Sequence, residues 1–266
     1  MSKAVFFLLL SCLGPASAFA QPGPSVFLDE MTWTEVRDAT RAGKTTVIIP
    51  IGGTEQNGPH MVLGKHNARV KLLAGRVAAT LGNALVAPVL AYVPEGPSSP
   101  PAGHMRFPGT ITIPDSVLEE ILESTARGFR LHGFKDVVFI GDHGGYQKAM
   151  GKAAAGLNRE WAKTSVRAHA IEDYYAAVEK DFHPYLKGKG FGAEEIGTHA
   201  GLADTSLALA VDPALVRSEM LKAPAKGKAD GVYGDPTRAS AELGRAGLDL
   251  IVERTVAAIR KATARR

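Results

Sequence analysis

The chain has 266 residues, a length that fits one large domain with a single hydrophobic core. Its 31 basic and 27 acidic residues give a modest formal net charge of +4. The basic side chains are scattered, so the charge pattern excludes an electrostatic footprint for nucleic-acid binding.

The N-terminus has the features of an export signal. Lys3 precedes an apolar run at residues 4–10, and Ala18-Phe19-Ala20 follows, so we predict a signal peptide at residues 1–20 that is removed after Ala20. The apolar run is too short to span a membrane, and no later segment is long enough. Lipoprotein processing at Cys12 is the alternative, but we favour simple release. The domain at residues 21–266 would then be periplasmic or secreted, without a disulfide or a thiol nucleophile.

The first half of this domain alternates helix and strand. Thr32 and Glu35 form a capping-box pattern, which predicts a helix that ends near Gly43. Residues 45–51 are apolar without alternation and rich in β-branched side chains, which predicts a strand buried on both faces. We then expect, in chain order, a glycine- and proline-rich loop at 50–66, a helix at 67–81, a second buried strand at 85–93 and a proline-rich loop at 94–108.

The second half repeats the alternation. Pro114 and Gly133 are typical of the start and the end of a helix at 114–132. The other elements expected are strands at 110–113, 136–140 and 166–171, a helix that runs to about residue 163, and a helix opened by residues 198–205. Alternating strands and helices predict a mainly parallel sheet with helices on both faces.

Side chains that suit a metal follow two of these strands. Glu55, His60 and His66 lie in the loop after the first strand, and His143 follows the third. Ligands of open α/β sheets bind at the carboxyl ends of the strands, and a carboxylate with neutral imidazoles is a natural ligand set for a divalent metal. One such residue alone more often caps a turn or faces solvent. Several together favour a metal site.

Four ordered motifs carry a family resemblance. They are Thr54-Glu55-Gln56-x-Gly58-Pro59-His60, His104-Met105-x-Phe107-Pro108-Gly109-Thr110, His143-Gly144-Gly145 and His199-Ala200-Gly201-x-x-Asp204-Thr205-Ser206. From residue 32 to about 213 the chain resembles the creatininase (creatinine amidohydrolase) family, as a divergent exported member. The resemblance implies a three-layer α/β/α sandwich, a homo-oligomer that is often a hexamer, and a divalent-metal site that activates water against a ring amide or a similar bond.

The chain departs from the two-metal pattern that the resemblance implies. Asn57 replaces a histidine, and His66 replaces an aspartate that bridges the two metals. Gly145 and Leu202 occupy the two positions that can supply a glutamate to the second metal. All these losses fall on one metal, so we expect a site for a single ion.

The ligands that remain by resemblance are Glu55, His66 and His143. Three protein ligands and one open position for water are the arrangement of catalytic zinc. A terminal imidazole suits a site without a second cation, because no bridging charge is needed. We therefore expect one divalent metal per chain, with Zn²⁺ as the first choice and Mn²⁺ or Fe²⁺ as alternatives.

The resemblance also assigns other residues to the reaction. His199 would move a proton to the leaving atom, a role that suits its near-neutral pKa. Asp204 could orient His199, orient a ligand imidazole or serve as a fourth ligand. His60, His104 and Thr110 are candidates for substrate contact, although His60 could equally bond to its own turn and the other two could serve packing.

The leading functional hypothesis is a metal-dependent hydrolase of a small cyclic amide, lactam or related C–N bond. A lactone hydrolase is one alternative. A degenerate member that binds metal or a small ligand without turnover is another, because lost ligands also accompany lost activity. A scaffold protein of the cell envelope is the third.

Overall fold

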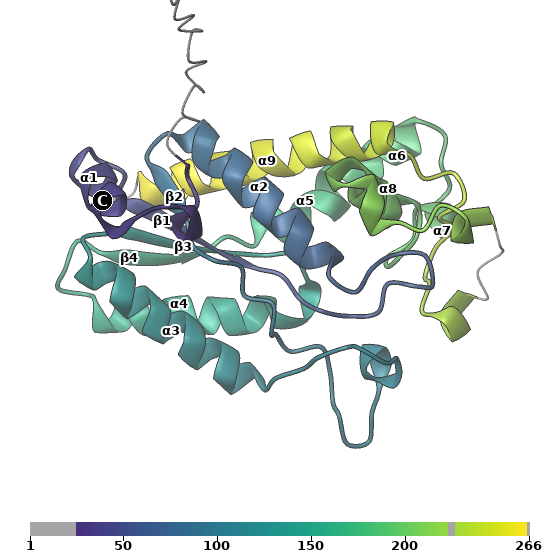
Figure 1. The fold of residues 1–266 in the computed structure, drawn as a ribbon, viewed down its shortest axis with the longest axis horizontal. Coiled ribbons are helices and arrows are strands. Elements are labelled where there is room, and N and C mark those ends of the chain that lie inside the picture. Colours follow the sequence, from purple (N-terminus) through teal and green to yellow (C-terminus); the bar gives the residue numbers. More distant parts are fainter. Residues whose placement is uncertain (1–24, 223–226, 265–266) are drawn as a thin grey trace, which may run out of the picture.

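A four-stranded parallel sheet, in the order β2-β1-β3-β4, forms the centre of the molecule in the computed structural model, which describes residues 25–222 and 227–264 (Figure 1). The strands are β1 (Thr46–Ile51), β2 (Ala84–Val86), β3 (Asp136–Gly141) and β4 (Arg167–Ala170). Every neighbouring pair in this order runs parallel, as predicted. The expected signal peptide, including Cys12, lies outside the described residues.

The two central strands, β1 and β3, are buried along their whole lengths. Their continuous apolar sequences follow from this position, because helices cover both faces of a parallel sheet. The pairing register sets Thr46 opposite Asp136 at one end and Ile51 opposite Gly141 at the other. The loops that follow the two strands therefore begin side by side.

Helices cover both faces of the sheet, which makes the fold an α/β/α sandwich (Figure 1). The principal ones are α2 (Lys65–Leu81) and α9 (Ala241–Thr263) on one face, and α3 (Asp115–Leu131) and α4 (Gln147–Glu160) on the other. Ile48 and Val138 point into the core beneath α2 and α9. Val47 and Val137 point into the opposite core, because successive side chains of a strand alternate between its faces.

The helix boundaries agree closely with the local signals. Helix α1 (Trp33–Arg41) begins after Thr32, which forms the expected capping box with Glu35. Pro114 is the N-cap of α3, and Gly133 follows that helix with a φ of +92°. Helix α2 begins at Lys65 rather than at residue 67, so its first turn already belongs to the candidate site.

Strand β2 is shorter than predicted. It ends at Val86 instead of extending to residue 93. Pro88 follows, and a proline has no backbone N–H to donate to a sheet. Beyond it, an isolated bridge between Ile51 and Leu90 continues the pairing.

Residues 110–113 do not form the predicted strand. Their backbone instead bonds to neighbouring loops, from Ile111 N–H to the carbonyl of Thr54 and from Ile113 N–H to the carbonyl of Val93. This short segment fastens the proline-rich loop against the loop that carries Glu55.

The segment between β4 and the last helix contains α8, the helix expected to open at residues 198–205, together with shorter elements that local signals did not indicate. A helical stretch after β4 packs on α9, and α8 packs on the same helix. The elements are α5 (Asp173–Ala177), a π-helical segment (Val178–Phe182), α6 (His183–Gly188), α7 (Ala193–Ile196) and α8 (Leu202–Val211). Short 3₁₀ turns occur at Leu28–Glu30, Gly103–Arg106, Gly144–Tyr146, Pro213–Leu215, Met220–Lys222 and Gly227–Asp230. None of the helices in the described ranges has both the length and the apolar character needed to cross a membrane.

The contact between α8 and α9 predicts a sharp effect of one added methyl group. A Cβ at Gly244 would overlap the carbonyl oxygen of Ser206 in α8, so Gly244→Ala should destabilise the fold by about 1–3 kcal/mol. Gly128 in α3 is the matched control, because a Cβ there meets nothing within 4 Å. Gly128→Ala should stabilise by about 0.5–1 kcal/mol. Urea unfolding measures both, and equal effects would contradict this account of the packing.

Candidate metal centre

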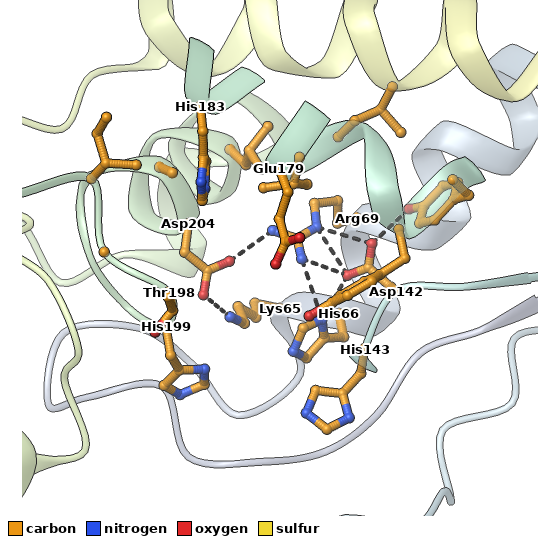
Figure 2. A pocket seen from close by; sticks show the side chains of 18 of the residues that line it. Lys65, His66, Arg69, Asp142, His143, Glu179, His183, Thr198, His199 and Asp204 are labelled. Atoms are coloured by element: carbon orange, nitrogen blue, oxygen red, sulfur yellow. Dashed lines mark hydrogen bonds and ion pairs between the residues drawn. The ribbon is translucent and has the colours of Figure 1, made fainter. Parts of the chain in front are cut away.

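The loops after β1 and β3 begin side by side at one end of the sheet, where the start of α2 and the loop after β3 border a cavity of about 200 Å³ (Figure 2). Five imidazoles line it. They come from α2, the proline-rich loop, the loop after β3, α6 and the segment before α8: His66, His104, His143, His183 and His199. Glu55 lies behind them and has no exposed surface. This is the strand-end position where open α/β sheets bind ligands.

Tyr146 joins the two loops. Its hydroxyl accepts the backbone N–H groups of Asp142 and His143, at 3.0 and 3.1 Å. The same hydroxyl lies 2.8 Å from the carbonyl oxygen of Ile51 and 2.6 Å from that of Gly52, and it donates to this pair. The ends of β1 and β3 are therefore held in a fixed relation, and with them the side chains that follow.

Glu55 is the centre of the imidazole group. Its Oε1 accepts a 2.7 Å hydrogen bond from His66 Nε2. Its Oε2 is buried without a hydrogen-bond partner, 3.3 Å from His104 Nδ1 and 3.5 Å from His143 Nε2. Burial raises the pKa of Glu55, but the hydrogen bond and the charge of His66 outweigh it and bring the pKa well below its usual value. The carboxylate is therefore ionised.

One set among the described residues fits a divalent cation: Glu55, His104 and His143 each offer a ligand atom within 4.8 Å of the others. Burial lowers the pKa of His143 to about 4, so its imidazole is neutral and keeps a lone pair. An unpartnered buried carboxylate oxygen beside such nitrogens suits a metal, because a buried charge without a partner is costly. His104 Nδ1 also lies 3.0 Å from Gln56 Nε2, a contact that a metal at this nitrogen would displace.

His66 has a different environment from the one expected of a ligand. Its Nδ1 lies 2.6 Å from Asp142 Oδ2 and its Nε2 lies 2.7 Å from Glu55 Oε1. Ionised carboxylates can only accept hydrogen bonds, so both ring nitrogens of His66 act as donors and carry a proton. Burial and Lys65 lower the pKa of His66, but the two hydrogen bonds reverse this and raise it. The geometry thus favours His104 over His66 as the third ligand and makes His66 the group that holds Glu55.

A buried network of alternating charges continues from His66 (Figure 2). Arg69 donates to Asp142, with Nη2 and Oδ2 at 2.8 Å, and to Asp204, with Nη1 and Oδ1 at 2.8 Å. Lys65 pairs with the other oxygen of Asp204. Lys65 and Arg69 are one helical turn apart at the start of α2, so one face of that turn supplies both cations.

The remaining candidates from sequence lie as follows. His199 Nε2 donates to the carbonyl of Gln56 at 3.0 Å, and burial followed by the charge of Lys65 lowers its pKa to about 3. Asp204 accepts the Ala200 N–H at 3.0 Å besides its two cations. Thr110 Oγ1 accepts the Gln56 N–H at 3.1 Å. His199 and Asp204 line the cavity, whereas Thr110 does not.

His60 does not line the cavity. It is 1% exposed, and its Nε2 lies 2.9 Å from the hydroxyl of Thr205 at the start of α8. This contact ties the Glu55 loop to α8. His60 thus makes a structural contact with a distant helix, rather than with its own turn as one interpretation of the sequence suggested.

Sequence reasoning missed several residues of the site. Glu95, in the proline-rich loop, is 5% exposed, and its Oε2 lies 3.5 Å from His143 Nδ1. Burial and the charge of Glu55 raise the pKa of Glu95 to about 9. Glu179 and His183, four residues apart on the π-helical segment and α6, line another wall of the cavity (Figure 2). A carboxylate within a proline-rich loop was the one available signal for Glu95.

Comparisons with known proteins agree with this architecture. The creatininase family model, described as creatinine amidohydrolase, matches residues 29–259. A creatinine amidohydrolase of Pseudomonas putida is 28% identical over 89% of this chain and 97% of its own length. A mycofactocin precursor peptide peptidase of Mycolicibacterium smegmatis is 30% identical over 74% and 77%. A 3-dehydro-scyllo-inosose hydrolase of Thermotoga maritima is 26% identical over 73% and 58%.

Solved structures show the same relationship. A creatinine amidohydrolase structure superimposes with a TM-score of 0.75 at 26% identity, covering 90% of this chain and 98% of the other. A manganese form of creatininase gives 0.74 at 26% identity, with 90% and 99% covered. A zinc form of a creatininase variant gives 0.71 at 26% identity, with 90% and 98% covered. The chain therefore belongs to the creatininase family of hydrolases, and it carries a Glu/His/His group able to hold a metal.

The buried charge network predicts a large cost for removing one cation. The Lys65 side chain is 2% exposed, and Lys65→Met would leave Asp204 with one cation fewer, so the free energy of unfolding should fall by about 3 kcal/mol. Lys152→Met is the matched control, because Lys152 pairs with Glu119 at 2.6 Å but is 71% exposed. That change should cost less than about 1 kcal/mol.

Chemical denaturation of Lys65→Met, Asp204→Asn and the double variant completes the test. The two effects should be non-additive by about 1 kcal/mol or more, because the residues share one contact. Additive losses would mean that the pair is not coupled.

Proposed function

We propose that this protein is a metal-dependent hydrolase that cleaves a small cyclic amide, a lactam or a related C–N bond with one divalent metal per chain. The observation that carries the proposal is the unpartnered Oε2 of the buried Glu55, which faces His104 Nδ1 at 3.3 Å and His143 Nε2 at 3.5 Å beside the cavity. Membership of the creatininase family supports the reaction class.

The donor set supports zinc as the ion. One carboxylate and two imidazoles are a common ligand set of catalytic zinc, and Mn²⁺ and Fe²⁺ also accept it. Both a manganese form and a zinc form are known among the creatininases that this chain resembles. When bound, such an ion supplies a Lewis acid and lowers the pKa of its water.

His199 is the residue that we assign to proton transfer. Its Nε2 lies 3.0 Å from the backbone carbonyl of Gln56 and 3.1 Å from the side-chain nitrogen of the same residue. In the tautomer that we assign, Nε2–H donates to the carbonyl, which leaves the lone pair on Nδ1, 3.7 Å from Glu55 Oε1. This nitrogen can accept a proton at the edge of the ligand group and return it to the leaving atom. Burial lowers its pKa to about 3, below the near-neutral value expected from the sequence, so the imidazole is neutral before reaction and readily gives up a proton that it has accepted.

Asp204 acts on His199 through the backbone in this proposal. Its Oδ2 accepts the N–H of Ala200, which has a φ of +53°, an unusual conformation for a residue other than glycine. Lys65 and Arg69 fix the carboxylate. Asp204 is therefore a positioning residue for the turn that carries His199, rather than a fourth ligand.

The cavity supports a small substrate. Its volume of about 200 Å³ suits a ring of a few atoms with one or two substituents. Glu179 and His183 line another part of the wall and offer polar contacts to the rest of such a molecule. The relatives named as peptide peptidases favour one further candidate, the end of a peptide chain. Hydrolysis of a lactone, or binding without turnover, remains the alternative chemistry.

We further propose that the protein acts in the periplasm or outside the cell, after cleavage near Ala20, as a homo-oligomer that is hexameric in its full assembly. The export signal in residues 1–20 supports the location. The assembly is proposed from the resemblance of the four sequence motifs to a family whose members are often hexamers.

Metal content should depend on the proposed ligands. Wild-type protein should hold about one divalent ion per chain, and Glu55→Gln and His104→Ala should hold almost none, because each removes a donor of a three-residue set. His66→Ala should keep the ion with lower affinity, because His66 holds Glu55 without offering a lone pair. Elemental analysis after removal of loosely bound ions measures this.

The control for that experiment is His169→Ala. His169 also pairs with a carboxylate, Asp136, at 3.0 Å, but it lies outside the site. Full metal retention in His104→Ala with complete loss in His66→Ala would return His66 to the ligand set and remove His104.

A substitution of His199 should impair turnover without removing the metal. His199→Ala should keep its metal yet lose about 100-fold or more in kcat, because general acid–base catalysis contributes that much. The assay uses a panel of cyclic amides, lactams, lactones and short peptides. Activity that survives in metal-stripped protein would contradict the proposed chemistry. A metal-loaded protein inactive on every class would support binding without turnover.

A further inference from the structure

The second buried carboxylate near the metal group is Glu95. Glu95 is 5% exposed, and neither of its side-chain oxygens has a hydrogen-bond partner. Its backbone is held firmly, because its N–H donates to Thr112 Oγ1 at 3.0 Å and the same hydroxyl donates to the carbonyl of Gly96 at 3.1 Å. A carboxyl group that is buried and unpartnered on a firmly held backbone requires an explanation, since buried polar groups without hydrogen bonds are costly.

Glu95 and Glu55 approach His143 at its two different nitrogens. Glu55 Oε2 lies 3.5 Å from Nε2, and Glu95 Oε2 lies 3.5 Å from Nδ1. The His143 ring therefore has one carboxylate at its metal-facing nitrogen and another at the nitrogen behind. Imidazoles that bind metals commonly donate their other N–H to a carboxylate in this way, which fixes the tautomer and the ring orientation.

Two groups can pair with His143 Nδ1, and they select opposite tautomers. The Gly145 N–H lies 3.2 Å from Nδ1 and can donate to it only when the ring proton is on Nε2. A carboxyl oxygen of Glu95 can accept a hydrogen bond whether or not the group is ionised, and a bond from Nδ1 requires the tautomer with the proton on Nδ1. Only this second tautomer leaves a lone pair on Nε2, the nitrogen that faces Glu55 Oε2.

We propose that Glu95 is a positioning residue of the metal centre, which accepts the Nδ1–H of His143 and thereby presents Nε2 to the metal. The inference rests on the proposed function, because it assumes that His143 is a ligand. It adds a residue from the proline-rich loop that none of the family motifs in the sequence contains.

The surrounding backbone leaves room for this carboxylate. Gly53 has a φ of +151°, and a Cβ there would lie 2.5 Å from Glu95 Oε1. Gly145 is tightly placed to a lesser degree, since its Cβ would lie 3.0 Å from His143 Cε1 and 3.4 Å from the carbonyl of Pro94. Glycines on two loops thus allow Glu95 and His143 to approach each other.

The test measures metal affinity rather than activity. Purified wild-type, Glu95→Leu and Glu95→Gln proteins are titrated with Zn²⁺ and with Co²⁺ in competition with a chelator. Glu95→Leu should bind about 10–100-fold more weakly, the usual loss for a residue behind a ligand imidazole. Glu95→Gln should recover part of this loss, because its amide oxygen also accepts an N–H. At saturation, the visible Co²⁺ spectrum should match that of wild type, because the ligand atoms are unchanged.

Asp136→Asn is the matched control. Asp136 is 3% exposed and accepts from His169, so it is a second buried carboxylate that pairs with an imidazole, but at the opposite end of β3. Its variant should have unchanged metal affinity even if its thermal stability falls. A fall in affinity equal to that of Glu95→Leu would mean that destabilisation alone weakens binding, and the inference would be wrong.

The other outcomes are equally decisive. Glu95→Leu with wild-type affinity would overturn the positioning role, and an altered Co²⁺ spectrum at saturation would overturn it in favour of direct ligation. If wild-type protein binds neither ion, the proposed function itself fails, whereas tight wild-type binding that is indifferent to Glu95 removes only this inference.

Discussion

The polar architecture of the site depends on one carboxylate, that of Glu55, which has no exposed surface at the point where the loops after β1 and β3 meet. A buried charge is tolerated only with a close partner, and His66 provides it at 2.7 Å. Both ring nitrogens of His66 carry a proton, so Nδ1–H also needs an acceptor, which Asp142 provides. The buried Asp142 carboxylate is in turn paired with the Arg69 guanidinium. The result is an alternating series of six charges: Glu55, His66, Asp142, Arg69, Asp204 and Lys65.

This series divides the imidazoles of the site into two kinds. His66 lies within it and its pKa is raised, because two carboxylates outweigh the effects of burial and of Lys65. His143 and His199 lie beside it, and burial lowers their pKa values to about 4 and about 3. Neutral imidazoles keep the lone pair that metal binding or proton acceptance needs. Buried ion pairs add little net stability in general, so this network is better explained by the protonation states that it establishes.

The family relationship defines the framework more than the substrate. Relatives of similar identity are named for creatinine, for a precursor peptide and for a cyclic inosose, so one fold supports several hydrolytic reactions. The segments that differ most from simple strand–helix alternation border the cavity here. The proline-rich loop brings His104 and Glu95, and the π-helical segment with α6 brings Glu179 and His183. Substrate choice is expected to lie in these segments, because the central strands mainly fix the positions of the ligand loops.

The sequence by itself determined the parts of this protein that depend on neighbouring residues. The capping box at Thr32, the buried runs of β1 and β3, and Glu55 and His143 at their ends are all local patterns. Pairings between distant residues were decided only in the tertiary structure: His66 with Asp142, 76 residues away, and Lys65 with Asp204, 139 residues away. Glu95 and His104 joined the site in the same way, through a loop without periodicity. The physical reason is that protonation and ligation depend on which groups share a buried volume, and this follows from how the loops pack at the sheet edge.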